Sequence, residues 1–361
     1  RTRSVKGIRV EVIVASDLLL DNPPGCHGQK PVQGYNDAMN GLQQDNTARR
    51  LLLIGTLCGA VSAFGYSAAN IFLRRLVSCD PTWVSTVKSV PTILLVIPWL
   101  LLRRRAGMKE SRHRRSLLIL LVTGLAGSLM GNVAFQWSLG VVGLAVAVPV
   151  CFGSMLVSSP LLSRAVLGEV ISRQTILAMS ILILSIILLS AWVKPIDQAQ
   201  LVSGRSVLTA ILLLCMAGIA YTTLGVGIRY GLDNGVSLPA TLGIISVSGF
   251  LFLGSLSLRS IGWAEMLSTE PQDLLDMLLA GIFNAIAFLS LTRAIQLTSV
   301  TYVNLINASQ VAIAALCGVV LFNEEPTLLM AIGVILTIAG LMLMQKPAHR
   351  RDKDASLVLP E

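Results

Sequence analysis

The chain has 361 residues, of which 54% are apolar and only 13% charged, and its formal net charge is +9 at pH 7. Soluble domains carry roughly 25% charged residues, so the composition excludes a pair of ordinary soluble domains. The mean hydropathy of +0.74 indicates a polytopic helical membrane protein. The basic residues gather in short connections between apolar runs, chiefly residues 103–115. That pattern is typical of topology signals and argues against nucleic acid as a partner.

Cysteine and histidine positions give no sign of a metal site. Four of the six cysteines lie inside apolar runs, the three histidines lie in polar segments, and no Cys-x-x-Cys pair occurs. We therefore expect no metal, no cofactor and no disulfide framework.

Residues 1–48 are polar and irregular, with breakers at Pro23-Pro24-Gly25 and Asn40-Gly41. We expect a disordered cytoplasmic tail without regular structure. The chain opens on Arg1, so this segment could be a start-site artefact, with Met39 as a sensible start.

From residue 49 onward, apolar runs alternate with short polar connections. A membrane-spanning helix needs about 20 mostly apolar residues, and ten runs meet or approach that length. They are Leu51–Leu73, Trp83–Leu102, Leu117–Leu139, Val141–Leu162, Ile176–Val193, Val207–Gly227, Leu238–Leu258, Leu274–Ala294, Val300–Phe322 and Leu328–Met344. The third and fourth runs are expected to form a hairpin that turns at Gly140.

The ten runs fall into two halves that repeat each other. Leu167-Gly168-Glu169 matches Phe322-Asn323-Glu324-Glu325, and Leu57-Cys58 matches Leu214-Cys215 at nearly the same offset. We expect an all-α protein of two five-helix repeats, residues 49–194 and 206–346, with a short cytoplasmic tail over 347–361. Because five is odd, the second half must be inverted relative to the first, as in many secondary transporters.

Orientation follows from the lysines and arginines, which are concentrated in the connections on one side of the predicted bundle. The positive-inside rule therefore places both termini in the cytoplasm. The fifth and tenth runs lack amides and charges in their middle, so we expect them to face lipid or a second copy in a homodimer. The other eight runs would then line a pathway.

Polar residues inside membrane helices are costly and often functional. Here they form stripes at helical spacing on the first, third and ninth runs, with single residues elsewhere. For any one residue, hydrogen bonding to a neighbouring helix is the simpler reading, but three striped helices favour a common cavity. The candidate pathway residues are Tyr66, Asn70, Lys88, Asn132, Gln136, Tyr221, Asn284, Asn304, Asn307 and Gln310.

Lys88 is the charged member of this set, and it shares a helix face with Ser85 and Thr92. It could extend to the outer headgroups or point into the cavity, where its ammonium would attract a carboxylate or phosphate. No Asp or Glu occurs in the middle of any run and no histidine lies in one. We therefore expect no catalytic residues, no enzyme activity and no carboxylate-based proton coupling.

These residues resemble the drug/metabolite transporter superfamily, specifically EamA-like ten-helix transporters, over about residues 50–346. The resemblance is carried by Ala134–Leu139 leading into a run with Pro149, and by the Leu-Gly-Glu and Asn-Glu-Glu-Pro endings. Lys88 stands where such proteins often have arginine. Leu305 replaces the equivalent of Pro149, so the ninth helix is expected to be straighter than the fourth.

The resemblance implies an inner-membrane carrier that works by alternating access and exports amino acids or other small metabolites. Two alternatives stay open: a carrier for phosphorylated or nucleotide-linked sugars, and a non-transporting membrane scaffold. The expected partners are a small-molecule substrate and the lipid bilayer.

Overall fold

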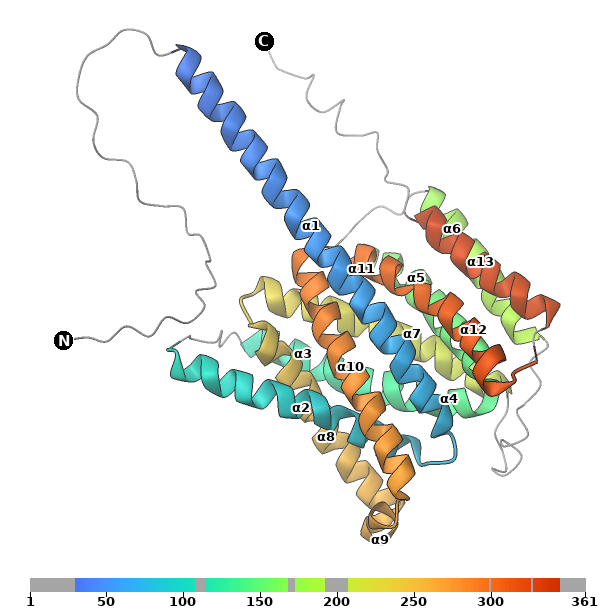
Figure 1. The fold of residues 1–361 in the computed structure, drawn as a ribbon. Coiled ribbons are helices and arrows are strands. Elements are labelled where there is room, and N and C mark those ends of the chain that lie inside the picture. Colours follow the sequence, from blue (N-terminus) through green and yellow to red (C-terminus); the bar gives the residue numbers. More distant parts are fainter. Residues whose placement is uncertain are drawn as a thin grey trace. The chain divides into compact units, whose positions relative to one another are not determined.

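The computed structural model describes residues 30–107, 114–167, 173–191, 207–298, 300–325 and 327–344. Within these ranges the chain is helical and contains no strand (Figure 1). The helices are α1 (Lys30–Arg75), α2 (Pro81–Arg105), α3 (Arg114–Ala126), the π-helix η1 (Gly127–Val133), α4 (Ala134–Val142), α5 (Leu144–Leu167), α6 (Arg173–Ala191), α7 (Val207–Asp233), α8 (Leu238–Ser260), α9 (Gly262–Leu267), α10 (Pro271–Leu297), α11 (Val300–Asn307), α12 (Ser309–Phe322) and α13 (Leu328–Met344). Residues 50–361 form one compact unit, separate from residues 1–49.

Several helices begin where the sequence supplies a cap. Asp80 precedes α2, and its carboxylate accepts hydrogen bonds from the backbone N–H groups of Thr82 and Trp83 at 3.0 and 2.9 Å. Ser237 similarly caps α8 by accepting from Ala240 N at 3.3 Å. Proline at the first or second helical position needs no hydrogen-bond partner, and α2, α8 and α10 each have one there.

Among the described residues, eight helical segments are long and apolar enough to cross a membrane. They cover the first four and the sixth to ninth predicted runs, with α3, η1 and α4 together making the third and α11 and α12 the ninth. The apolar parts of α6 and α13 are shorter, at Arg173–Leu189 and Leu328–Gly340. The chain is thus an all-helical, multi-pass membrane protein.

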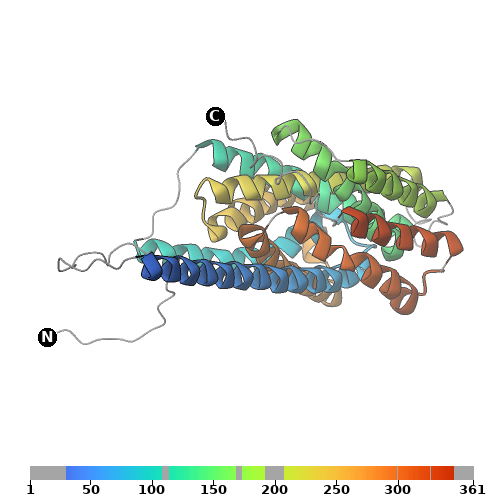
Figure 2. The same cartoon turned by 90° about the horizontal axis from the view of Figure 1, so that it is seen from above.

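Helices from distant parts of the sequence pack together in this unit. α6 lies alongside α13, α2 packs against both α8 and α10, and α5 packs against α7 (Figures 1 and 2). Each of these four pairs joins a helix from the first half of the sequence to one from the second. The two halves therefore share a single packed interior.

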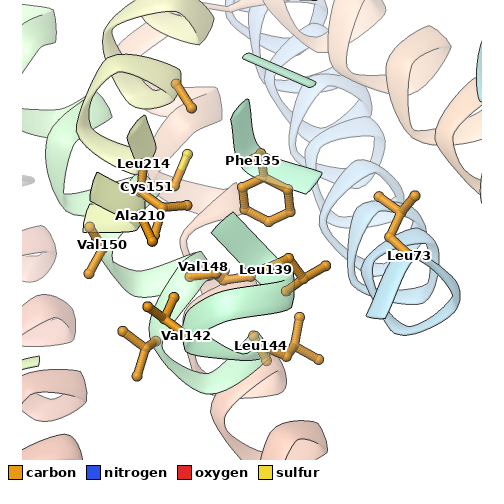
Figure 3. Close-up of a cluster of buried hydrophobic side chains, with 14 of the residues drawn as sticks. Leu73, Phe135, Leu139, Val142, Leu144, Val148, Val150, Cys151, Ala210 and Leu214 are labelled. Atoms are coloured by element: carbon orange, nitrogen blue, oxygen red, sulfur yellow. The ribbon is translucent and has the colours of Figure 1, made fainter. Parts of the chain in front are cut away.

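The larger buried cluster centres on α4, α5 and α7, where Leu139, Val148 and Leu214 meet (Figure 3). These three side chains are at most 1% exposed. The cluster continues to Leu73 at the end of α1, so it fixes the helix ends next to the site described below.

Three expectations from the sequence need correction. α1 begins at Lys30, inside the segment expected to lack structure, because extending an existing helix costs far less than nucleating one; residues 1–29 lie outside the described ranges. The turn between the third and fourth spans lies at Gly143, not Gly140. Its φ of 78° is a left-handed conformation that glycine adopts without strain.

The third correction concerns the ninth span. Because Leu305 replaces proline, the sequence predicts a straighter helix here than in the fourth span, yet the α-helix is interrupted between α11 and α12 at Ala308. The backbone there closes a tighter turn, in which Val311 N donates to Ala308 O at 3.0 Å. In contrast, α5 continues through both Pro149 and Pro160.

Candidate functional site

A cavity of about 180 Å³ lies within the helical unit and is lined by residues from both halves of the sequence. Its described lining comes from α1, α2, α3, η1, α4 and α5 of the first half and from α7, α8, α10, α11 and α12 of the second. None of the described lining residues belongs to α6 or α13. The lining includes nine of the ten candidate pathway residues: Tyr66, Asn70, Lys88, Asn132, Tyr221, Asn284, Asn304, Asn307 and Gln310.

Asn132 joins three helices at one wall of the cavity. Its side-chain oxygen accepts hydrogen bonds from Lys88 Nζ of α2 at 2.8 Å and from the Tyr221 hydroxyl of α7 at 3.0 Å. Lys88 is only 6% exposed, so it points into the protein and does not extend to the headgroups. The sequence left two orientations open for Lys88, toward the outer headgroups or into the cavity, and the structure has the second.

The π-helix η1 positions Asn132. Its wider turn is a form often found at functional sites, and it contains Gly131 beside Tyr221. A Cβ at Gly131 would lie 2.7 Å from Tyr221 Cε1, so only glycine lets the tyrosine ring approach closely enough to reach Asn132. The small residue and the π turn therefore work together to assemble this wall.

A second polar group lies at the interruption of the ninth span. Asn307 Oδ1 accepts from Ser62 of α1 at 3.0 Å and from Gln310 Nε2 of α12 at 2.9 Å. Asn307 also donates to Val303 O at 3.1 Å. The network connects α1 to both pieces of the interrupted helix.

Gln136 is the one candidate that does not line the cavity. Its amide nitrogen donates to the backbone carbonyls of Leu73 and Leu76 at 3.0 and 3.3 Å. These carbonyls lie at the C-terminal end of α1, where a helix leaves its last carbonyls without intrahelical partners. In this structure Gln136 ties α4 to the end of α1.

The selection of polar residues from the sequence did not include every residue that lines the cavity. α8 contributes Ser246 and Gly249, although the apolar run Leu238–Leu258 contains no amide or charge, and Phe135, Phe152 and Phe288 supply aromatic surface. Such residues are ordinary in a core, so small or aromatic identity alone could not single them out from the sequence.

Lys88 is the only charged residue in the described lining, which contains no Asp, Glu, Arg or His. The described residues also contain no group of three His, Cys, Asp or Glu side chains that could hold a metal ion. The cavity thus offers one cation, several neutral hydrogen-bonding groups and apolar surface.

The fold and the cavity define a multi-pass membrane protein with a solute-sized site between its two halves. The sequence model of the EamA-like transporter family matches residues 53–191 and again residues 208–345. The chain belongs to this EamA-like transporter family, within the drug/metabolite transporter superfamily. The family comprises membrane transporters of small solutes and not enzymes.

Comparison with solved structures supports the same fold. A solved chain described only as "Crystal structure of protein" superposes with a TM-score of 0.55 at 17% identity, covering 81% of this chain and 96% of its own length. At this identity the likeness concerns the fold alone. The curated proteins include no match.

Proposed function

We propose that the protein is a secondary carrier that exports small organic metabolites, amino acids or related solutes, across the cytoplasmic membrane by alternating access. The observation that carries this proposal is the cavity, which both sequence repeats line with amides and hydroxyls. A site shared by two repeats can be exposed to either side when the repeats move against each other. The interruption at Ala308 and the π turn of η1 give the lining helices places to bend.

We further propose that the bundle has ten transmembrane helices, in two inverted halves. In addition to the eight long spans, α6 and α13 have 19 and 17 residues. These lengths reach the lower bound of about 17 residues for a spanning helix. Both helices are strongly exposed on one side, at Ile187 (57%) and Ile335 (63%) for example, which suits contact with lipid or with a second copy.

A carrier for phosphorylated or nucleotide-linked sugars is less well supported. A phosphate monoester carries about two negative charges near neutral pH. The described lining offers Lys88 as its single cation, so up to one negative charge would remain unpaired in a buried site.

Counterflow in proteoliposomes tests the carrier function. Vesicles are preloaded with an unlabelled mixture of amino acids and organic acids, and labelled single solutes are offered outside. We expect transient accumulation of at least one label above that in protein-free liposomes. Absence of counterflow for every amino acid and organic acid offered would contradict the proposal and favour one of the two alternatives, a sugar-phosphate carrier or a non-transporting scaffold.

A further inference from the structure

The charge of Lys88 has no counter-ion in the described part of the protein. Its side chain lies between Ser85 and Thr92 on the inner face of α2, and these neighbours are 3% and 2% exposed. Its ammonium group has three N–H donors, and the structure gives one of them an acceptor, the neutral amide oxygen of Asn132 at 2.8 Å.

A buried cation without a partner is costly, and protein sites normally neutralise it with an anion. The described cavity lining does not supply one, since it contains no Asp or Glu. The Asn132 oxygen is already shared with the Tyr221 hydroxyl at 3.0 Å, so it cannot satisfy Lys88 further. The free donors of Lys88 are left for whatever enters the cavity.

The remaining lining restricts the body of the ligand. Lys88 can pair with one negative group of a ligand only. No carboxylate is present in the described lining to pair with an ammonium group. Phe135, Phe152 and Phe288 provide apolar surface, while Asn284 and Asn304 can hydrogen-bond a carbonyl or hydroxyl. A ligand with a single negative charge and a mainly apolar body fits these features best.

We propose that the substrate is a small organic monocarboxylate, whose carboxylate binds Lys88 Nζ and whose uncharged body lies against the apolar part of the cavity lining. This inference rests on the proposed carrier function and specifies its substrate class. It also separates an anion from the zwitterionic amino acid of the same carbon skeleton, because binding the zwitterion requires burying an ammonium group opposite Lys88 without a carboxylate beside it.

Equilibrium binding to the purified full chain in detergent, measured calorimetrically, tests the substrate class. Two matched series are used: ketoisocaproate, leucine and isoamylamine, and phenylpyruvate, phenylalanine and phenethylamine. We expect one or both oxo acids to bind at least tenfold tighter than the matching amino acid, with no binding of the amines. Equal or tighter binding of an amino acid or amine, or no binding of either oxo acid, would overturn the proposal.

The Asn132→Asp variant tests the role of Lys88 while keeping the lysine in place. The new carboxylate would replace the amide oxygen 2.8 Å from Nζ and provide an internal counter-ion, so we expect oxo-acid affinity to fall at least tenfold. Asn234→Asp makes the same change at an exposed position between α7 and α8 and should leave affinity unchanged. Unaltered oxo-acid binding in Asn132→Asp would overturn the assignment.

If Asn132→Asp does not elute as a folded species, Lys88→Met takes its place with the same expectation. The ligand series on the unmodified protein decides the substrate class independently of either variant. The binding and counterflow experiments can also give different results, and the combination shows which of the two proposals is wrong. Counterflow of an amino acid without oxo-acid binding overturns this inference and leaves the carrier, whereas oxo-acid binding without counterflow of any solute overturns the carrier and leaves the site.

Discussion

Asn307 holds the interrupted ninth span in place through its side chain. Its amide oxygen receives hydrogen bonds from Ser62 on α1 and from Gln310 on α12, and all three residues are at most 3% exposed. Loss of one donor in such a buried network leaves the remaining groups partly unsatisfied, at a cost of about 1–3 kcal/mol. The geometry of the cavity wall at this point therefore depends on a few amide contacts.

We predict that Gln310→Leu lowers the counterflow rate by about tenfold, because the change leaves the buried Asn307 oxygen without one of its two donors, at a cost of about 1–3 kcal/mol. The matched control is Ser180→Leu, which makes a polar-to-leucine change at an exposed position of α6. Its rate should stay within about twofold of the unmodified protein. Equal losses in the two variants would contradict the separation between cavity-lining and lipid-facing helices.

Ser185 would be a poor control, although it lies on the same helix. Its hydroxyl donates to Gly333 O at 2.7 Å and its side chain is buried between α6 and α13. The sequence shows that the fifth span lacks amides and charges, but it does not show which of its sides packs against the tenth.

Helical spacing identified most of the cavity-lining amides, and Gln136 shows where that reasoning ends. The spacing of Asn132 and Gln136 puts them on one face only if the helix between them is a regular α-helix. The π turn of η1 has more residues per turn, so residues after it are rotated relative to that frame. Nothing in the local sequence distinguishes Gly127–Val133 from an ordinary glycine-containing membrane helix.

At the scale of the elements, Glu324 joins three helices near the end of α12. Its carboxylate accepts from Arg74 Nε at 3.0 Å and from the backbone N–H groups of Leu144 and Ala145 at 2.8 and 2.9 Å. The first N–H groups of a helix lack intrahelical partners and favour negative charge. Glu324 therefore satisfies the start of α5 and pairs with the end of α1 at once.

We predict that Glu324→Leu lowers the free energy of unfolding by about 3–5 kcal/mol, because it leaves Arg74 buried and unpaired and offers no substitute for the carboxylate. Arg74→Met should cost less, since the carboxylate keeps its two backbone donors. Chemical unfolding in detergent micelles provides the measurement. Glu265→Leu, at an exposed position of α9, is the control and should change stability little. A larger loss for Arg74→Met than for Glu324→Leu would contradict this account.

The contact between α5 and α7 depends on Gly218. A Cβ there would lie 2.5 Å from the Cys151 carbonyl oxygen and 2.8 Å from Met155 N, and these backbone atoms cannot move aside like a side-chain end. We predict that Gly218→Ala separates the two helices and costs about 1–3 kcal/mol.

Thermal unfolding of the purified protein checks the Gly218 prediction. Gly254→Ala on α8 is the matched control, because its nearest neighbour would be Thr86 Cγ2 at an ordinary 3.4 Å. The control should be neutral or slightly stabilising, since alanine favours helix more than glycine. An unchanged melting temperature for Gly218→Ala would show that the α5–α7 contact has room that the structure does not indicate.

The order and approximate bounds of the helices followed from hydropathy alone, but their interruptions did not. Gly140 and Gly143 both follow the third apolar run, and the choice between them depends on which one must adopt positive φ to start α5. The break at Ala308 likewise has no proline to mark it, whereas Pro149 lies within a continuous helix. Tertiary contacts, such as those of Asn307 and Glu324, decide these points.

At the scale of the whole molecule, the orientation of the two repeats in the membrane decides which connections face the cytoplasm and which face outward. The distribution of lysine and arginine favours a cytoplasmic location for both termini. On that basis the connection between α7 and α8 lies inside and α9 lies outside, with α8 between them.

We predict that Glu265→Cys reacts with a membrane-impermeant maleimide in intact cells, and that Asn234→Cys reacts only after the cells are permeabilised. Both positions are exposed and they flank the same helix, so each serves as the control for the other. The parent protein gives the background. Its Cys79, between α1 and α2, should contribute little, because burial and the nearby Asp273 carboxylate raise the pKa of this thiol to about 11. Little reactive thiolate is therefore present at neutral pH.

The opposite labelling pattern would place both termini outside the cell and contradict the orientation inferred from the lysines and arginines. Labelling of both positions in intact cells would mean that α8 does not cross the membrane. In that case the number of spans in the second half would no longer be five, and the inverted relation between the halves would no longer hold. The labelling experiment thus tests orientation and inversion together, independently of any substrate.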